Sequence, residues 1–189
     1  VLGAGKDNGP MPAMRDYTPR RYDLDTLELD IDFVLHGDGP ASTWAEQAKP
    51  GQFLHIGGPR GSMIVPDIFD SYLLIGDETA LPAIARRLEG LAANRRALVI
   101  IEVENGKEQQ VLESAAEVSV IWVLREGGQD HLLNTVRQID VPAGSLYAWI
   151  ATETKVSRQI RRVLLDDHGL DDQFVKAVGY WRLDDTPEE

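Results

Sequence analysis

Continuous apolar runs in the second half of the chain constrain the fold more than any other feature. They lie at residues 72–75, 97–103, 118–124 and 146–151, and a further strand is expected near 174–181. A strand that is apolar on both faces is typical of a parallel sheet, because helices cover both sides of such a sheet. The pattern therefore predicts a buried parallel sheet.

Helical segments separate these strands, as the crossovers of a parallel sheet require. The predicted helices cover residues 81–91, 109–115, 131–139 and 156–168. The last helix places its apolar side chains on one face and turns Arg158, Arg161 and Arg162 to solvent. This alternation of strand and helix predicts a doubly wound α/β domain.

The first part of the chain has a different pattern. Across residues 27–36 apolar and acidic residues alternate, which predicts a half-buried antiparallel strand with five apolar side chains facing a core. A second strand is expected at 52–58. The capping box formed by Thr43 and Glu46 predicts a short helix from Trp44 to about residue 48.

Two short motifs flank the alternating strand. Arg15-Asp16-Tyr17-Thr18 precedes it, and Gly39-Pro40-Ala41-Ser42 follows it. The arginine can set its guanidinium on a phosphate and the tyrosine its ring against a flat ring, while a helix starting at the glycine turn presents N–H groups to a second anion. The pair of motifs predicts a flavin dinucleotide site. The first motif, taken alone, is equally explained if Arg15 and Tyr17 are solvent-exposed side chains of a surface strand that bind no ligand.

Composition excludes several classes of protein. The formal net charge of −12 argues against a nucleic-acid partner, whose phosphates demand clustered cations. The chain has no cysteine, which excludes thiol catalysis and a cysteine-ligated iron–sulfur cluster and agrees with the expected cytoplasmic location. No run of about eighteen apolar residues occurs, so we expect no membrane span. The four histidines lack metal-ligand spacing, so no metal site is predicted.

The turn Gly76-Asp77-Glu78-Thr79-Ala80 joins the first strand of the α/β domain to its helix. Ligands of such sheets sit at the carboxyl ends of the strands. The turn lacks the Gly-x-Gly-x-x-Gly fingerprint, so its spacing favours dinucleotide binding only weakly. Thr152-Glu153-Thr154 occupies the analogous place at another strand end. Glu102 ends a third strand and could accept a ribose hydroxyl or simply be solvated.

Several blocks of sequence, spread over nearly the whole chain, resemble the siderophore-interacting protein family. In the family's order they are Asp32-Phe33-Val34-Leu35-His36-Gly37, Gly39-Pro40-Ala41-Ser42-Thr43-Trp44-Ala45, Gly58-Pro59-Arg60-Gly61-Ser62, Gly76-Asp77-Glu78-Thr79-Ala80-Leu81-Pro82-Ala83 and Gly179-Tyr180-Trp181-Arg182. The family comprises flavoproteins similar to ferredoxin reductases, which reduce ferric siderophores with NADPH or NADH.

The resemblance implies a β + α/β architecture. An antiparallel flavin-binding β-barrel would occupy residues 1–67, and a doubly wound parallel-sheet domain that binds NAD(P)H would occupy residues 68–189. A closed barrel needs about six strands, and the first 67 residues provide three or four at most. We therefore expect the N-terminal barrel strands to be missing.

The resemblance and the motifs together assign roles to particular residues. The FAD-binding set is Arg15, Tyr17, Thr18, His36, Gly39, Ala41, Ser42, Thr79, Ala80 and Trp181. The nicotinamide-binding set is Asp77, Glu78, Thr79 and Glu153. Basic side chains near the flavin edge hold the anionic ferric chelate in the family, and Arg60 and Lys176 match two of those positions. On composition alone, Trp181 would more simply belong to the core.

These observations predict an NAD(P)H-dependent, FAD-containing ferric-siderophore reductase whose chemistry is carried by the flavin rather than by a catalytic side chain. Two alternatives stay open. One is a flavin reductase that passes electrons to a protein partner, and the other is a non-catalytic protein that binds a ferric chelate or flavin. The choice between NADPH and NADH also stays open, because Lys155 and Arg158 could meet a 2′-phosphate or simply be solvated.

Overall fold

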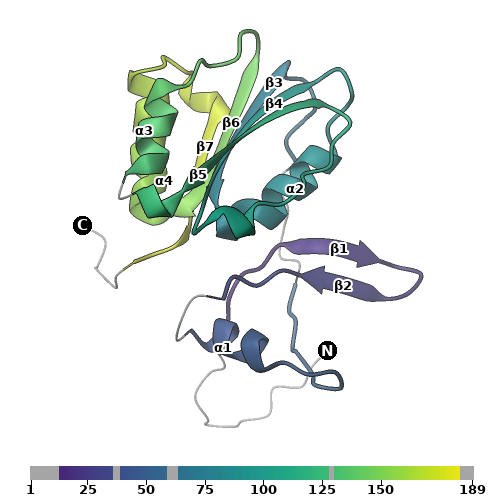
Figure 1. Ribbon diagram of the computed structural model, residues 1–189. Coiled ribbons are helices and arrows are strands. Elements are labelled where there is room, and N and C mark those ends of the chain that lie inside the picture. The colour runs from purple at the N-terminus through teal and green to yellow at the C-terminus, as the bar shows by residue number, and fades with distance from the viewer. Residues whose placement is uncertain (1–12, 36–38, 59–63, 128–129, 184–189) are drawn as a thin grey trace.

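The computed structural model describes residues 13–35, 39–58, 64–127 and 130–183. It has two parts, which Figure 1 shows one above the other: an N-terminal part with a two-stranded sheet and one helix, and an α/β part built on a five-stranded sheet. No helix in the described ranges is long and apolar enough to cross a membrane.

The five-stranded sheet is parallel throughout, as predicted. Its strands are β3 (Ser71–Asp77), β4 (Arg96–Val103), β5 (Glu117–Leu124), β6 (Leu146–Glu153) and β7 (Val175–Trp181). They lie in the order β5-β4-β3-β6-β7, so the chain builds outward from β3 first to one side and then to the other. The strand order therefore reverses between β3 and β6, which is where open α/β sheets bind ligands.

Helices cover both faces of this sheet (Figure 1). The helix α2 (Leu81–Glu89) packs on one face, and α3 (His131–Gln138) and α4 (Thr154–Asp166) pack on the other. In α4 the apolar residues Ile160, Val163 and Leu164 are buried, which confirms the amphipathic helix predicted there. A separate apolar core on each face explains why β3 is buried along its whole length.

The prediction of a helix at residues 109–115 is wrong. After the single turn η2 (Gly106–Glu108), the chain runs to β5 without a helix. Leu112 and Ala116 still pack against the core beneath α2, and the Ser114 hydroxyl donates to the Leu88 carbonyl at 2.7 Å. The apolar spacing therefore reflects anchoring of an irregular segment on α2, which already covers that face.

The N-terminal part is smaller than its sequence pattern predicts. The strands β1 (Pro19–Asp23) and β2 (Glu28–Ile31) form an antiparallel hairpin, and α1 (Pro40–Gln47) follows. The expectation of five core-facing side chains is wrong, because Leu27 is 86% exposed and Leu29 is 41% exposed. No second sheet layer faces the hairpin within the described residues, and two strands alone cannot enclose a core.

Two further local predictions also fail in this part. Residues 52–58 form no strand and are exposed. Thr43 lies inside α1 rather than at its cap, because the helix starts one turn earlier, with Gly39 as N-cap and Pro40 in its first turn. Pro40 pre-sets the backbone angle of a first helical turn, which outweighs the capping-box pattern here.

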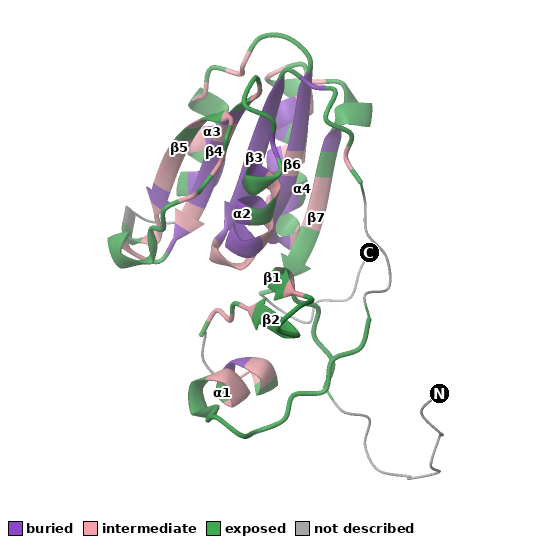
Figure 2. Cartoon of the chain, turned by 90° about the vertical axis from the view of Figure 1, so that its right-hand side faces the viewer, coloured by how far each residue is buried: buried purple, intermediate pink, exposed green. Residues whose placement is uncertain are grey.

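Contacts with α2 and β7 hold the N-terminal part beside the α/β part. Arg20 pairs with Glu89 at 2.7 Å, and the Arg86 guanidinium lies 5.4 Å from the centre of the Tyr22 ring. The Thr18 side chain lies against the Tyr180 phenol, where it lowers the pKa that burial raises. Figure 2 shows β1 directly beneath the end of β7. The N-terminal part therefore lies at the carboxyl edge of the parallel sheet.

Candidate functional site at the carboxyl edge of the sheet

Asp77 organises the carboxyl edge of the sheet at the end of β3. Its carboxylate accepts hydrogen bonds from the Thr79 N–H at 2.9 Å and from the indole N–H of Trp181 at 2.7 Å. The carboxylate is buried, with 3% of Asp77 exposed, and this burial raises its pKa, while the donors on Thr79 and Trp181 oppose the rise. One buried carboxylate thus ties together β3, the turn η1 (Glu78–Ala80) and the last residue of β7.

Two glycines let these segments approach one another. A Cβ on Gly76 would lie 2.5 Å from the Ala80 Cβ and 3.2 Å from the Ala151 carbonyl oxygen. A Cβ on Gly179 would collide with Thr154, whose hydroxyl donates to the Trp181 carbonyl at 3.0 Å. The turn after β3 and the end of β7 can therefore close on β6 because both positions lack a side chain.

Glu153 caps the helix that follows β6. One oxygen of its carboxylate accepts from the N–H groups of Lys155 at 2.6 Å and Val156 at 3.1 Å. This bond satisfies the first donors of α4 and places Glu153 at the same edge as Asp77. The predicted contact of Glu153 with a nicotinamide stays a prediction.

An ion-pair cluster at the ends of β3, β4 and β5 was not recognised from the sequence. Arg125 contacts Glu78 at 2.7 Å, Glu102 at 3.3 Å and Glu104 at 2.8 Å. Partial burial raises the pKa of Glu102, and the neighbouring guanidinium opposes that rise. Arg125 directly follows the third apolar run, so the rule that parallel strands end at one edge could have revealed it. Glu102 is thus an ion-pair partner rather than a simply solvated strand end.

An aromatic cluster brings the two N-terminal motifs together. The Tyr17 ring lies 4.6 Å from the Phe33 ring, which lies 5.8 Å from the Trp44 ring of α1. Gly39 contributes no side-chain cap to the start of α1. Arg15 is exposed beside Tyr17 and donates to the Met14 carbonyl at 2.7 Å.

The Tyr17 segment also reaches the end of β7. Thr18 lies against Tyr180, the neighbour of Trp181. The segment that carries the Arg15 guanidinium, the Tyr17 ring and the Thr18 hydroxyl therefore lies beside the edge that Asp77 organises, and Phe33 connects the Tyr17 ring to Trp44 of α1. Such a set of groups fits a flavin dinucleotide.

The other predicted site residues fall in different places. Ala80 is fully buried, so a cofactor contact there would need the turn to move. Lys176 is exposed near the start of β7, in register with Trp149, whose ring packs on Tyr180 at 5.9 Å. His36 and Arg60 lie outside the described residues. Across the residues that are described, no group of three or more potential metal ligands comes together.

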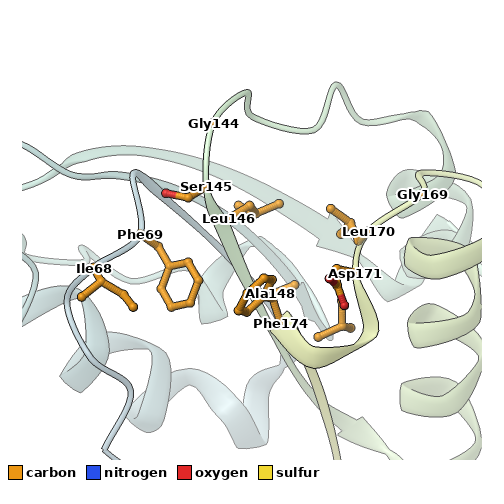
Figure 3. Close-up of a pocket in the computed structure, with 11 residues that line it drawn as sticks. Ile68, Phe69, Gly144, Ser145, Leu146, Ala148, Gly169, Leu170, Asp171 and Phe174 are labelled. Carbon is orange, nitrogen blue, oxygen red and sulfur yellow. The ribbon is translucent and has the colours of Figure 1, made fainter.

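Two pockets differ in character and place. The first, of about 420 Å³, lies at the opposite, amino edge of the sheet. Figure 3 shows its apolar wall, where the Phe69 and Phe174 rings meet with centres 5.3 Å apart. The second, of about 440 Å³, lies between the start of α4 and the end of β7 and includes Trp181. The second pocket therefore adjoins the carboxyl-edge site, whereas the first is remote from it.

Two family models match the chain. Residues 69–184 match the model described as siderophore-interacting protein, and residues 4–63 match the siderophore-interacting FAD-binding domain. Together the matches cover both parts of the structure.

Curated relatives and solved structures agree with these matches. The chain is 36% identical to the NADPH-dependent ferric-chelate reductase of Escherichia coli, covering 92% of this chain and 68% of that protein. It is 31% identical to the ferric vibriobactin reductase ViuB of Vibrio cholerae, over 90% of this chain and 65% of that protein. A siderophore utilization protein from T. fusca superposes with a TM-score of 0.83 at 38% identity, over 93% of this chain and 68% of that one. The chain thus spans about two thirds of the length of its relatives.

Proposed function

The chain belongs to the siderophore-interacting protein family, and we propose that it is an NAD(P)H-dependent flavoprotein that reduces ferric siderophores and so releases ferrous iron. The observation that carries the proposal is the junction of its two parts: the segment with Arg15, Tyr17 and Thr18 meets the carboxyl edge of the parallel sheet beside Trp181. A ligand held by the first part therefore faces the edge where a nucleotide binds to the second.

In this proposal residues 1–67 hold FAD and residues 68–189 hold the nicotinamide dinucleotide. Arg15 and the start of α1, at Gly39, Ala41 and Ser42, neutralise and bind the flavin phosphates, while Tyr17, Thr18 and Trp181 border the ring. His36, Thr79 and Ala80 complete the proposed FAD set. A bound flavin accepts a hydride from a nicotinamide and releases single electrons, which is what reduction of ferric iron requires.

In this proposal the side chains of the protein position the ligands and do not themselves take part in the reaction. Asp77 fixes the indole of Trp181 and the turn after β3, and Glu153 fixes the start of α4. Asp77, Glu78, Thr79 and Glu153 line the proposed place of the nicotinamide. Arg60 and Lys176 are the proposed cations that attract an anionic ferric chelate.

Two measurements on the purified chain test this function. Titration with FAD, followed by absorbance and flavin fluorescence, should show stoichiometric binding. Anaerobic addition of NADPH or NADH should bleach the flavin absorbance, and a ferric siderophore should then restore it while a ferrous trap develops colour. A chain that binds no FAD would overturn the proposal, and bleaching without any ferrous product would turn it into reduction of another acceptor.

A matched pair of variants tests the chelate site. Lys176→Ala should slow the chelate-dependent reoxidation of the flavin and leave its reduction by the nicotinamide almost unchanged. Lys107→Ala is the control, because Lys107 is another exposed lysine, in η2 after β4, and two strands of the sheet lie between β4 and β7. Equal behaviour of the two variants would remove Lys176 from the site without affecting the proposed reductase activity.

A further inference from the structure

The linker between the two parts, residues 64–70, is fastened to the α/β part at the amino edge of the sheet. Asp67 lies in this linker, and Arg95 lies just before β4. The Arg95 guanidinium donates from Nε to the Asp67 carboxylate at 2.8 Å and from Nη2 to the Asp67 carbonyl at 2.6 Å. One arginine therefore holds both the side chain and the backbone of the same linker residue.

A buried residue of the core anchors the same carboxylate. Tyr72 is fully buried, and its hydroxyl donates to the Asp67 carboxylate at 2.9 Å. Arg87, in the last turn of α2, lies over the Tyr72 ring at 5.0 Å and donates to the Val65 carbonyl at 3.3 Å. These contacts of Asp67, Arg95, Tyr72 and Arg87 form what we name the linker clasp.

The contacts of β1 with α2 are weaker than the linker clasp. Arg20 and Glu89 pair through partly exposed side chains, and Tyr22, which contacts Arg86, is exposed. Exposed ion pairs contribute little free energy. The clasp instead combines two hydrogen bonds from Arg95, whose side chain is 19% exposed, with a buried phenol. It is therefore the firmer of these two attachments.

The clasp lies at the opposite edge of the sheet from the candidate site. With seven residues, β3 spans about 20 Å between the two edges. Over that span, a rotation of about 10° at the linker would move the N-terminal part at the far edge by about 3.5 Å. A displacement of reacting groups by about 1 Å can already cost about a hundredfold in rate. Small motions at the linker therefore have large effects at the site.

From these contacts we propose that Asp67, Arg95 and Arg87 are positioning residues. The linker clasp sets the orientation of the N-terminal part on the α/β part. It thereby sets the distance between a flavin held by the first and a nicotinamide held by the second. That effect on the ligands rests on the proposed function, whereas the effect on orientation does not depend on it.

A distance measured between two spin labels tests the orientation without any ligand. The chain has no cysteine, so two introduced cysteines are the sole labelling sites. Asp25→Cys places one in the turn between β1 and β2, and Gln138→Cys places the other at the end of α3, both at exposed positions. With the clasp intact the distribution of distances should be narrow. Arg95→Ala in the same background should broaden or shift it.

Arg96→Ala is the matched control. Arg96 follows Arg95 and also donates to a loop carbonyl, that of Ala143 at 3.0 Å, but both residues lie within the α/β part. This variant should leave the distances unchanged. Asp67→Ala breaks the clasp from the linker side and should act as Arg95→Ala does.

Two results would overturn the proposal. One is a distribution that stays narrow and in place in both Arg95→Ala and Asp67→Ala. The other is equal broadening in Arg96→Ala, which would indicate general loosening of the structure. Far-ultraviolet circular dichroism of all variants should coincide, because the two buried cores are left intact.

Kinetics on the FAD-loaded chain test the effect on the ligands. Reduction of the flavin by saturating NADPH or NADH should slow about ten- to hundredfold in Arg95→Ala, while the dissociation constant of FAD changes less than about twofold. Arg95→Lys can restore a single bond to Asp67 and should recover part of the rate. Broadened distances with an unchanged rate of reduction would overturn the positioning role, and so would a loss confined to FAD binding.

Failure of the clasp and failure of the proposed function give different results. Broadened distances in Arg95→Ala, in a chain that binds no FAD, would support the clasp and contradict the proposed reductase. Ferric reduction at the full rate in Arg95→Ala, with unchanged distances, would do the reverse.

Discussion

At the scale of single residues, Asp77 is the group whose ionisation is most closely tied to the site. Burial raises its pKa above the usual 3.8, so the folded chain holds this proton to a higher pH than the unfolded chain does. The contribution of Asp77 to stability is therefore largest at low pH and falls as the pH rises from about 3.8 through the folded-state pKa.

Asp77→Asn tests this sign, because the amide does not titrate. In urea unfolding between about pH 4 and about pH 7, the free energy of unfolding of the unaltered chain relative to Asp77→Asn should fall as the pH rises. Other carboxylates, such as Asp67 and Asp70, have lowered pKa values and act in the opposite sense, but they are common to both proteins and cancel in the difference. Parallel curves for the two proteins would contradict a raised pKa at Asp77.

Arg15 is the residue that should matter most for FAD and least for the fold. It is exposed, and no carboxylate pairs with it in the described part of the chain. Arg15→Ala should therefore lose one charge-assisted bond to phosphate, worth roughly 1.5–3 kcal/mol, and weaken FAD binding about ten- to hundredfold.

The control for Arg15 is Arg21→Ala, a neighbouring arginine that is already held by Asp30 at 2.6 Å and Glu28 at 3.0 Å. Melting temperature without FAD should barely change on Arg15→Ala, since the side chain packs against little. FAD titration curves that coincide for Arg15→Ala and the unaltered chain would remove Arg15 from the site.

At the scale of elements, the close contact of β3 with the turn that follows depends on Gly76. Gly76→Ala places a methyl group 2.5 Å from the Ala80 Cβ, so the turn or β6 must shift. Overpacking of this kind costs typically about 1–3 kcal/mol. Gly106→Ala is the control, because nothing lies within 4 Å of its added Cβ. Equal unfolding midpoints for the two variants in urea would show that the turn yields without cost.

Elements that bury both faces were the ones that the sequence predicted well. The runs that became β3 and β4 are apolar because α2 covers one face and α3 and α4 cover the other. The alternating segment around Leu29 carries a true strand signal, yet only residues 28–31 pair, because register and length depend on partners that a local pattern does not contain. The prediction of a helix at 109–115 failed for the same reason. The local pattern does not contain the core on which these apolar residues anchor a loop.

At the scale of the whole molecule, the sequence predicted where the site lies better than how its groups are connected. The rule for strand ends placed Asp77 and Glu153 at one edge, as the structure does. The bond from Trp181 to Asp77 spans 104 residues, and the grouping of Arg125 with three glutamates depends on strand order. Neither could be read from spacing, because both are set by which strands become neighbours.

The net charge of the whole molecule and the cations at the proposed site predict opposite effects of salt on the rate of the reaction with an anionic chelate. A body with a net charge of −12 repels an anionic ferric chelate, and salt that screens this repulsion would speed the reaction. Steering by cations at the site has the opposite sign. If Lys176 and Arg60 dominate, as proposed, reoxidation of the reduced flavin by an anionic chelate slows as salt rises from about 0.01 M to about 0.1 M, over which the screening length shrinks from about 30 Å to about 10 Å.

The variant Lys176→Ala separates these two contributions. Without this cation the slowing by salt should weaken or turn into acceleration, because the acidic body then dominates the field that the chelate meets. Stopped-flow measurement of flavin reoxidation gives the rate directly, and a neutral ferric chelate should show little salt dependence with either protein. Acceleration by salt already in the unaltered chain would mean that the body outweighs the site, and Lys176 would then be an ordinary surface cation whose field the approaching chelate does not sense.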